Sequence, residues 1–268
     1  MKGGPKLLRA APALLRVGLA EAIAYRAEVL IWVLTATMPL VMLAIWSAVV
    51  EDVTVPGLDQ RALTRYFTVT LIVRQCTSAW LVWELNNEIR SGSLSSHLLK
   101  PLSPVWLHVA RNLVSYPLRF AVVAPVVGAL VYFQPPMDLE LSIVKGLVFV
   151  LSCALAWASV FSMQLAFGSL AFFTGQSLGL FNLWFGLWSV FGGYLMPVSL
   201  LPGPLRVAGD YLPFRAMLSI PVEIGADLLP PAAWALALRE QTLWAVFCLG
   251  VGLLAWRLGL RRYGAFGG

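Results

Sequence analysis

Charged residues and histidines are scarce in this sequence. Only 12% of the 268 residues are charged and two are histidine, whereas an average soluble domain has about 25% charged residues. The chain contains no G-x-x-x-x-G-K-[ST] loop for a nucleotide phosphate, no His-Glu-x-x-His zinc motif and no Cys-x-x-Cys pair. We therefore expect no catalytic residue, no metal site and no cofactor in this chain, and we do not expect an enzyme.

Cysteine is scarce as well. Cys76, Cys153 and Cys248 each fall within an apolar run. A thiol in such a run behaves as a small hydrophobic side chain. These three positions therefore indicate no disulfide framework.

Long apolar runs dominate the rest of the chain, of which 59% is hydrophobic. A bilayer core of about 30 Å needs roughly 20 apolar residues in a helix. The sequence predicts an all-α integral membrane protein, a single domain over 1–268 with six transmembrane helices. Two of the six runs exceed the required length, so their helices can tilt or project. The predicted spans are Val29–Val50, Tyr66–Trp83, Leu107–Phe133, Leu141–Phe173, Gln176–Met196 and Thr242–Leu260.

Basic residues are distributed unevenly between the two sides of these spans. With the N-terminus inside, the inner segments hold eleven basic and four acidic residues, and the outer segments six basic and nine acidic ones. Cytoplasmic segments of membrane proteins are enriched in Lys and Arg, so we expect both termini to be cytoplasmic. The net charge of +6 then reflects membrane topology, and no nucleic-acid partner is indicated.

Two segments outside the spans have distinct compositions. Residues 1–28 are basic and alanine-rich, and we expect an interfacial helix on the inner membrane surface or an extension of the first span. Residues 197–241 contain seven prolines and apolar stretches too short to cross a bilayer. Exposed irregular backbone is not tolerated in lipid. We therefore predict re-entrant or interfacial helices on the outer side, before the sixth span.

The segment after the second span, residues 84–104, shows the clearest local signals. We expect the helix of this span to continue to Arg90 and to stop at Gly92 in a left-handed conformation. Ser93 is the predicted N-cap of a short helix, Leu94–Leu99, which ends before the next proline because a residue preceding proline avoids the helical region. Such a segment presents a compact surface to a cytoplasmic partner.

Two acidic residues, Glu84 and Glu88, lie one helical turn apart on one face of this segment, close to His97 and within reach of His108. A metal site or an acid/base pair would use these residue types, but they stand on separate short elements without a recognised ligand spacing. We favour pairing of the carboxylates with basic residues of a partner or a neighbouring helix.

Five residues within the spans are candidates for a translocation path. Arg74 and Arg119 lie inside spans, where a charge is expensive. Each guanidinium either snorkels or hydrogen-bonds to helix carbonyls, or lines a passage for anionic or lipid head groups. Phe181, Phe185 and Trp188 form one stripe of the fifth span, which either packs or contributes to the substrate path.

Two segments resemble bacterial permeases of ABC exporters, of the type-2 ABC membrane family. ELNNEIRSGSLSSHLLKPL, from Glu84, is similar to the family's cytoplasmic segment after the second span. FGGYLMPVSLLP, from Phe191, together with YLPF, from Tyr211, resembles its re-entrant outer segment before the last span. The resemblance covers almost the whole chain.

The resemblance implies the transmembrane subunit of an ATP-driven exporter in the bacterial cytoplasmic membrane. Two permease copies, identical or homologous, would pair with two separate ATPase subunits that bind ATP and magnesium. The substrate would be an amphipathic drug, lipid or glycan. The residues that match the family's ATPase-coupling segment are Glu84, Glu88, Arg90, Gly92, Ser93, Leu94, Leu98, Leu99, Lys100 and Pro101.

Two other functions stay open at the level of sequence. A secondary transporter or channel would need no ATPase, but a secondary transporter should carry acidic residues for coupling ions near the midplane. The spans contain no Asp or Glu, apart from Glu84 at a cytoplasmic end. A membrane-embedded enzyme would need a convergent cluster of histidines and carboxylates, for which two histidines leave little material.

Overall fold

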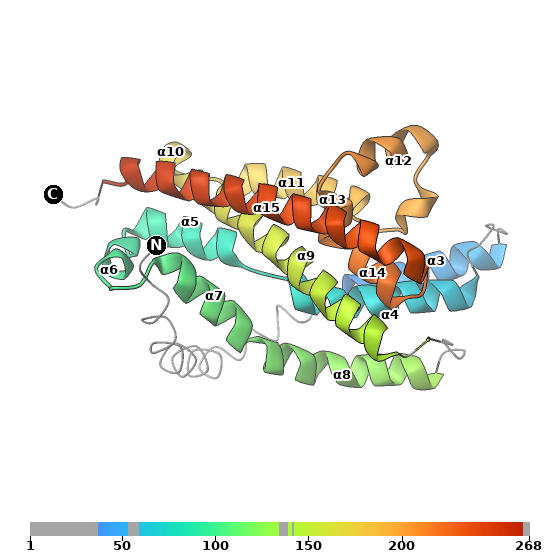
Figure 1. The fold of residues 1–268 in the computed structure, drawn as a ribbon. Coiled ribbons are helices and arrows are strands. Elements are labelled where there is room, and N and C mark those ends of the chain that lie inside the picture. Colours follow the sequence, from blue (N-terminus) through green and yellow to red (C-terminus); the bar gives the residue numbers. More distant parts are fainter. Residues whose placement is uncertain (1–36, 53–58, 134–138, 141, 265–268) are drawn as a thin grey trace.

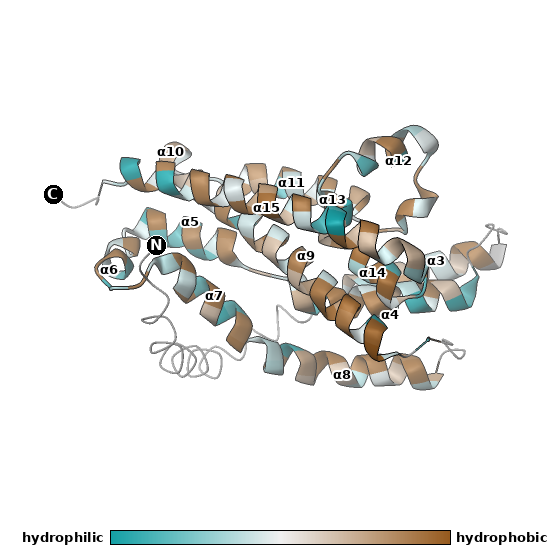
Figure 2. Ribbon diagram, in the orientation of Figure 1, coloured by the Kyte–Doolittle hydropathy of each residue, from teal (hydrophilic) through white to brown (hydrophobic). Residues whose placement is uncertain are grey.

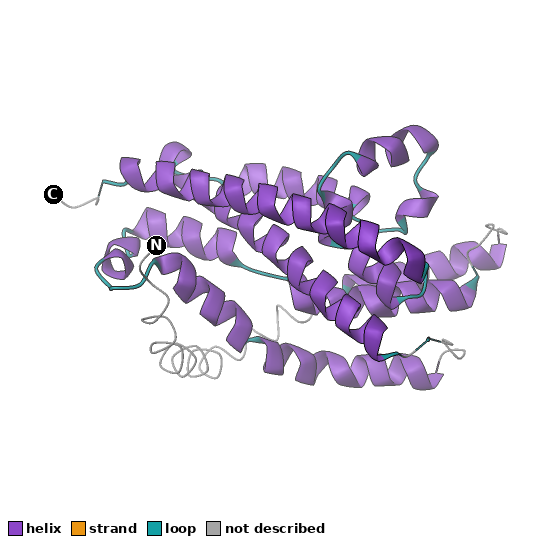
Figure 3. Cartoon of the chain, in the orientation of Figure 1, coloured by secondary structure: helices purple, strands orange, loops and turns teal. Residues whose placement is uncertain are grey.

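The computed structural model describes residues 37–52, 59–133, 139–140 and 142–264. This described part is almost entirely helical and contains no strand (Figure 3). The predicted interfacial segment 1–28 lies outside the described residues, as does the beginning of the first predicted span. The elements are α3 (Met38–Asp52), α4 (Gln60–Thr77), α5 (Leu81–Ser91), α6 (Leu94–Leu98), α7 (Pro104–Val114), α8 (Tyr116–Phe133), α9 (Ile143–Ser169), α10 (Ala171–Thr174), α11 (Leu178–Phe191), η1 (Val198–Leu200), α12 (Gly203–Asp210), α13 (Phe214–Met217), α14 (Ser219–Gly225) and α15 (Pro231–Arg262).

The helices form an elongated bundle along which the chain runs back and forth (Figure 1). α7, α8 and α11 run towards the end where α12 and α14 lie, and α4, α5, α9 and α15 run back towards the end that carries α6. α9 and α15 make the most extensive helix–helix contact. They approach closely at Gly252, where a Cβ would lie 2.5 Å from the Ser162 carbonyl oxygen. A small residue therefore permits this packing, as is common between membrane helices.

Among the described residues, three stretches are long and apolar enough to cross a membrane: Pro104–Phe133, Ile143–Thr174 and Pro231–Arg262. Their residues are mostly hydrophobic (Figure 2), and many of their large apolar side chains are exposed. Apolar surface of this extent is rare on soluble proteins, so the chain is a membrane protein, as predicted. Met38–Val50 and Leu178–Phe191 are also apolar but shorter, and the total of six spans stays a prediction.

The second predicted span is a broken helix. α4 ends at Thr77 and α5 begins at Leu81, with extended backbone at Ser78 (ψ 133°) and a non-helical Trp80 (φ −117°) between them (Figure 3). The predicted continuous helix from Tyr66 to Arg90 is therefore wrong. The freed backbone groups of the break are bound by side chains of other helices, which local sequence does not reveal.

The third and fourth predicted spans are each divided in two. α7 begins at Pro104, a residue suited to the first turn of a helix, and Ser115 separates it from α8. The third span therefore starts earlier than the predicted Leu107. In the fourth, α9 gives way at Leu170 to the short α10.

Each of the last two predicted spans differs from the observed helix at one end. α11 ends at Phe191 and not at Met196, because the chain turns there through Gly193, whose φ of +82° suits only glycine. α15 begins at Pro231. The last part of the predicted outer segment, 197–241, therefore belongs to the helix of the sixth span.

Part of the remaining segment folds against the bundle, whereas α12 is mostly exposed. α13 and α14 pack against α9, and α14 also packs against α4. Met217, Leu218, Ile220 and Ile224 are all 0% exposed, so these short helices contribute to the hydrophobic core. The segment is therefore no polar loop, as the sequence indicated. Its re-entrant position in a bilayer stays a prediction.

Candidate functional site

The break between α4 and α5 leaves carbonyl groups without helical partners, and side chains of α7 and α8 bind them. The Ser78 carbonyl accepts hydrogen bonds from Arg119 Nη1 (2.7 Å) and Asn112 Nδ2 (3.1 Å). The Cys76 carbonyl accepts one from the Tyr116 hydroxyl (2.7 Å). Because a helix C-terminus carries partial negative charge, the cation of Arg119 is well suited to the end of α4.

A glutamine of α9 bridges the break. Gln164 Nε2 donates to the Ala79 carbonyl (2.8 Å), and Gln164 Oε1 accepts from the Val82 N–H (3.4 Å). Irregular backbone at membrane depth is tolerated only where it is buried in protein or lines a cavity. The break fulfils both conditions.

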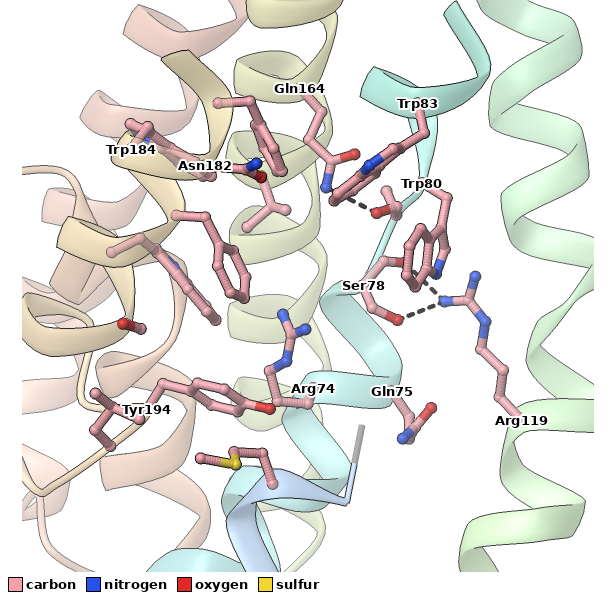
Figure 4. A pocket seen from close by; sticks show the side chains of 18 residues that line it. Arg74, Gln75, Ser78, Trp80, Trp83, Arg119, Gln164, Asn182, Trp184 and Tyr194 are labelled. Atoms are coloured by element: carbon pink, nitrogen blue, oxygen red, sulfur yellow. Dashed lines mark hydrogen bonds between the residues drawn. The ribbon is translucent and has the colours of Figure 1, made fainter. Parts of the chain in front are cut away.

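A cavity of about 460 Å³ lies beside the break (Figure 4). Pockets for small molecules usually measure about 300–1,000 Å³. The walls come from the start of α3, from α4, the break, α5, α8, α9 and α11, and from the turn that follows α11. The cavity is thus built from segments spread over much of the chain, and it is large enough for a ligand.

Aromatic side chains dominate the walls of this cavity. The stripe predicted on the fifth span lies here, with ring centroids 6.2 Å apart for Phe181 and Phe185 and 5.3 Å apart for Phe185 and Trp188. Sequence reasoning missed four further rings, because they come from other segments or from another side of α11. For two of these rings the sequence held a usable signal, namely two tryptophans three residues apart at the break. The missed rings are Trp80, Trp83, Trp184 and Tyr194.

Arg74 and Arg119, the two arginines predicted as candidates for a translocation path, both line the cavity. Arg74 lies over the rings of Trp188 and Tyr194, with its guanidinium carbon 4.9 and 5.0 Å from their centroids, in cation–π geometry. Arg119 is 5% exposed and donates through Nη1 to the carbonyl and the hydroxyl of Ser78. Arg119 therefore binds a carbonyl at the end of α4, as one interpretation of the sequence predicts, and it also lines a cavity. That this cavity is a passage for head groups stays a prediction. No Asp or Glu of the described part lines this cavity.

The two acidic residues of α5 pair with residues of α6 and α7. His108 Nδ1 lies 2.9 Å from Glu84, and His108 Nε2 lies 3.3 Å from Glu88. Glu88 also lies 3.4 Å from His97 and 3.5 Å from Arg111. Burial raises the pKa of Glu88, but the hydrogen bond from His108 and nearby positive charge outweigh it, so this pKa lies below its ordinary value. Pairing with a neighbouring helix is thus confirmed, and the described residues contain no metal-binding cluster.

The turn into α6 follows the prediction at Gly92, and at Ser93 it does so in position only. Gly92 has φ +75°, the left-handed conformation, and its carbonyl accepts a hydrogen bond from the Tyr263 hydroxyl (3.2 Å). Ser93 occupies the N-cap position directly before Leu94, as predicted, but it is itself helical (φ −66°, ψ −19°) and its side chain makes no capping bond. Its hydroxyl instead lies 2.9 Å from the Ser91 hydroxyl.

α6 has one anchored and one exposed side. Leu94 is 0% exposed and packs with apolar residues of α5 and α7, whereas Leu99, just past the helix, is 89% exposed. The other predicted coupling residues at this tip are also exposed, namely Arg90, Leu98, Lys100 and Pro101. This tip therefore exposes two leucines, Leu98 and Leu99, beside basic residues.

One motif was overlooked in the sequence. Gly175-Gln-Ser-Leu-Gly179 has the letters G-x-S-x-G of a hydrolase nucleophile elbow. Ser177, however, is 0% exposed, and its N–H and hydroxyl lie 3.2 and 3.4 Å from Asn86 Oδ1. Both histidines of the chain pair with carboxylates of α5. The motif therefore forms the turn into α11 and has no base beside its serine.

Most of this chain matches the model of a known protein family. The family described as ABC-2 family transporter protein matches residues 59–267, a region that contains the helix break, α6, α12 to α14 and all residues that line the cavity except Met38. Comparison with curated proteins and with solved structures gives no match. The family consists of membrane components of transporters, so the chain is a transport subunit, and it belongs to the ABC-2 family of transporter proteins.

Proposed function

We propose that this chain is the transmembrane subunit of an ATP-driven exporter of amphipathic molecules, of the drug, lipid or glycan class. Two copies of the permease would work with two ATPase subunits, which bind the ATP and magnesium. One observation carries the proposal: the same broken helix borders the cavity at one end and leads into the exposed turn of α6 at the other. Family membership supports the transport role.

α5 provides a direct connection between the tip and the cavity. It runs from the break at Trp80 to the turn at Gly92 without interruption. Leu94 and the Glu88–His97 contact hold α6 against it. A displacement of Leu99 by a partner would therefore move α5 as a rigid element, and the non-helical residues of the break would absorb the change as a hinge.

The charge distribution supports a cytoplasmic location for the end that carries α6. Arg90, Lys100, Arg257, Arg261 and Arg262 all belong to this end of the bundle (Figure 1), and Lys and Arg are enriched on the cytoplasmic side of membranes. In this proposal α6 meets the ATPase in the cytoplasm of a bacterial cell, and the cavity lies within the membrane.

A secondary transporter is the main alternative, and one observation favours it. Broken helices with ion sites near the midplane are typical of such proteins, and the α4–α5 break is of that kind. Na⁺ or H⁺ coupling usually relies on carboxylates, whereas the described walls of the cavity contribute two arginines and no acid. The ATP-driven mechanism therefore fits better.

The test reconstitutes the chain with an ABC ATPase subunit in proteoliposomes and measures transport of an amphipathic dye with and without ATP. Leu99→Asp should reduce ATP-dependent transport about tenfold or more, because it places a charge at the centre of the docking surface. Leu228→Asp is the matched control, since Leu228 is 44% exposed at the opposite end of the bundle. ATP-independent transport, or normal ATP-dependent transport by Leu99→Asp, would contradict the proposal.

A further inference from the structure

The cavity beside the break is lined by positive charge and by no acidic residue of the described part. Arg74 and Arg119 both line it. Glu84, on the first turn of α5, interacts electrostatically with Arg119 without lining the cavity, and its carboxylate is bound to His108 (2.9 Å). In a membrane interior, where the dielectric constant is low, such charges attract an anion far more strongly than in water.

The cavity also offers N–H groups that lack acceptors. Arg74 Nε and Gln75 Nε2 are buried without a hydrogen-bond partner among the described residues, and Gln75 is 1% exposed. Arg119 bonds to Ser78 through Nη1, whereas a guanidinium has five N–H donors. Buried donors in native proteins normally have partners. An oxyanion, which only accepts hydrogen bonds, fits this set.

Aromatic rings hold Arg74 and form an apolar wall next to it. Its guanidinium lies over Trp188 and Tyr194, and a stacked guanidinium keeps its in-plane N–H groups free for an oxyanion. Figure 4 shows the Arg119 side chain reaching from α8 towards Ser78, on another side of the cavity. Phe181 and Phe185 of α11 complete a cavity in which charged and apolar surfaces adjoin.

We propose that this cavity selects anionic amphipathic substrates, an inference that rests on the proposed transport function. It holds an oxyanion of the phosphate, sulfate or carboxylate type between Arg74 and Arg119, and the aromatic or alkyl body of the same molecule packs against α11. The two guanidinium groups repel cationic amphiphiles, and neutral ones gain no charge-assisted hydrogen bond. Among the proposed drug, lipid and glycan substrates, the site thus selects the acidic ones.

The test compares three probes that share one aromatic body: 2-naphthyl phosphate, 2-naphthol and 2-naphthylmethylammonium. Binding to the full chain in phosphatidylcholine nanodiscs is measured by titration calorimetry. The phosphate should bind about tenfold more tightly than the neutral probe, and the cation most weakly. Because it should weaken binding of 2-naphthyl phosphate far more than binding of 2-naphthol, Arg74→Gln should remove this preference. Arg206→Gln, which alters an exposed arginine of α12, is the matched control and should retain it.

Arg119 needs a separate pair of variants because it also supports the helix break. Arg119→Lys keeps a cation at the site and should keep most of the anion preference. Arg119→Gln should lose the anion preference. A melting curve of this variant serves as the control that it is folded during the binding measurement. Equal affinity of the wild type for all three probes would overturn the proposal. So would an anion preference that persists in both Arg74→Gln and folded Arg119→Gln.

Two further titrations identify the source of the oxyanion. Inorganic phosphate should bind at least about tenfold more weakly than 2-naphthyl phosphate, since it lacks the body that packs against α11; equal binding would overturn the assignment of an amphipathic ligand. Phosphatidylglycerol in the nanodisc should compete with 2-naphthyl phosphate if the site takes a lipid head group. Binding without such competition identifies a soluble amphiphile and supports the same chemistry.

Failure of this inference and failure of the proposed function are distinguishable. The binding assay contains neither ATP nor an ATPase. Anion preference without ATP-driven transport would support the site and refute the exporter. ATP-driven transport by a chain that binds all three probes equally would support the exporter and refute the anion site.

Discussion

Replacing Arg119 with leucine tests how the buried cation contributes to the helix break. The change removes hydrogen bonds to the Ser78 carbonyl (2.7 Å) and hydroxyl (2.9 Å), while Asn112 keeps one to the same carbonyl (3.1 Å). A buried acceptor that loses its partner costs about 1–3 kcal/mol. Relief of the desolvation of a 5% exposed cation acts in the opposite direction. Because Arg119 also faces the negative end of α4, we expect a net loss near the lower limit, about 1 kcal/mol.

The assay is thermal unfolding of the purified chain in nanodiscs, followed by transport in proteoliposomes. A loss of about 1 kcal/mol corresponds to a decrease in Tm of roughly 2–4 °C. Arg119→Lys is the control and should lose less, since it retains a cation and a donor. An unchanged or higher Tm for Arg119→Leu would refute the reasoning, because desolvation would then outweigh the hydrogen bonds. A lower Tm with normal transport of an anionic amphiphile per folded molecule would exclude Arg119 from the substrate path.

Three further predictions concern nucleotide, the turn and pH. The chain alone should neither bind nor hydrolyse ATP, as it lacks a phosphate loop; stoichiometric binding in equilibrium dialysis would contradict this. Gly92→Val should lower transport-coupled ATPase activity but not the amount of protein in the membrane. The reason is backbone strain, because a β-branched residue is strained at φ +75° even though no atom lies within 4 Å of the added Cβ. Unchanged coupling would exclude this turn as the contact with the ATPase. The pKa of Glu88 lies below the ordinary 4.5, so its pairing stabilises fully above that pH and is lost as the pH falls through the folded value. The Tm difference between wild type and Glu88→Gln should shrink from pH 7 towards about pH 3, and a constant difference would show that Glu88 does not titrate as described.

Local patterns determined several parts of the fold. The apolar runs that contain α8, α9 and α15 predicted membrane helices because length and hydropathy are properties of the segment itself. The left-handed turn at Gly92 was predictable because glycine alone adopts it without strain. Ser93 shows the limit of such rules, since a residue with good capping chemistry was drawn into a helical conformation by its neighbours.

The candidate site could be predicted only in part. Arg74, Arg119 and the aromatic stripe of α11 stood out because charge is rare in a span and rings at helical spacing share a face. Gln75 and Tyr194 did not, because nothing in their own segments connects them to a cavity. Their common position follows from the packing of α4, α9 and α11.

The sequence by itself determined that this chain enters a membrane, where its apolar runs lie, and that two arginines within them need partners. Only the tertiary structure decided where the second span breaks. The residues Ser78, Ala79 and Trp80 include neither proline nor glycine, so local propensity gives no reason for a break there. The break persists because Arg119 and Gln164, 41 and 85 residues away from their partners, bind the carbonyls that it exposes. Such long-range hydrogen bonds exist only once the helices have packed, since buried backbone groups must find partners wherever the fold supplies them.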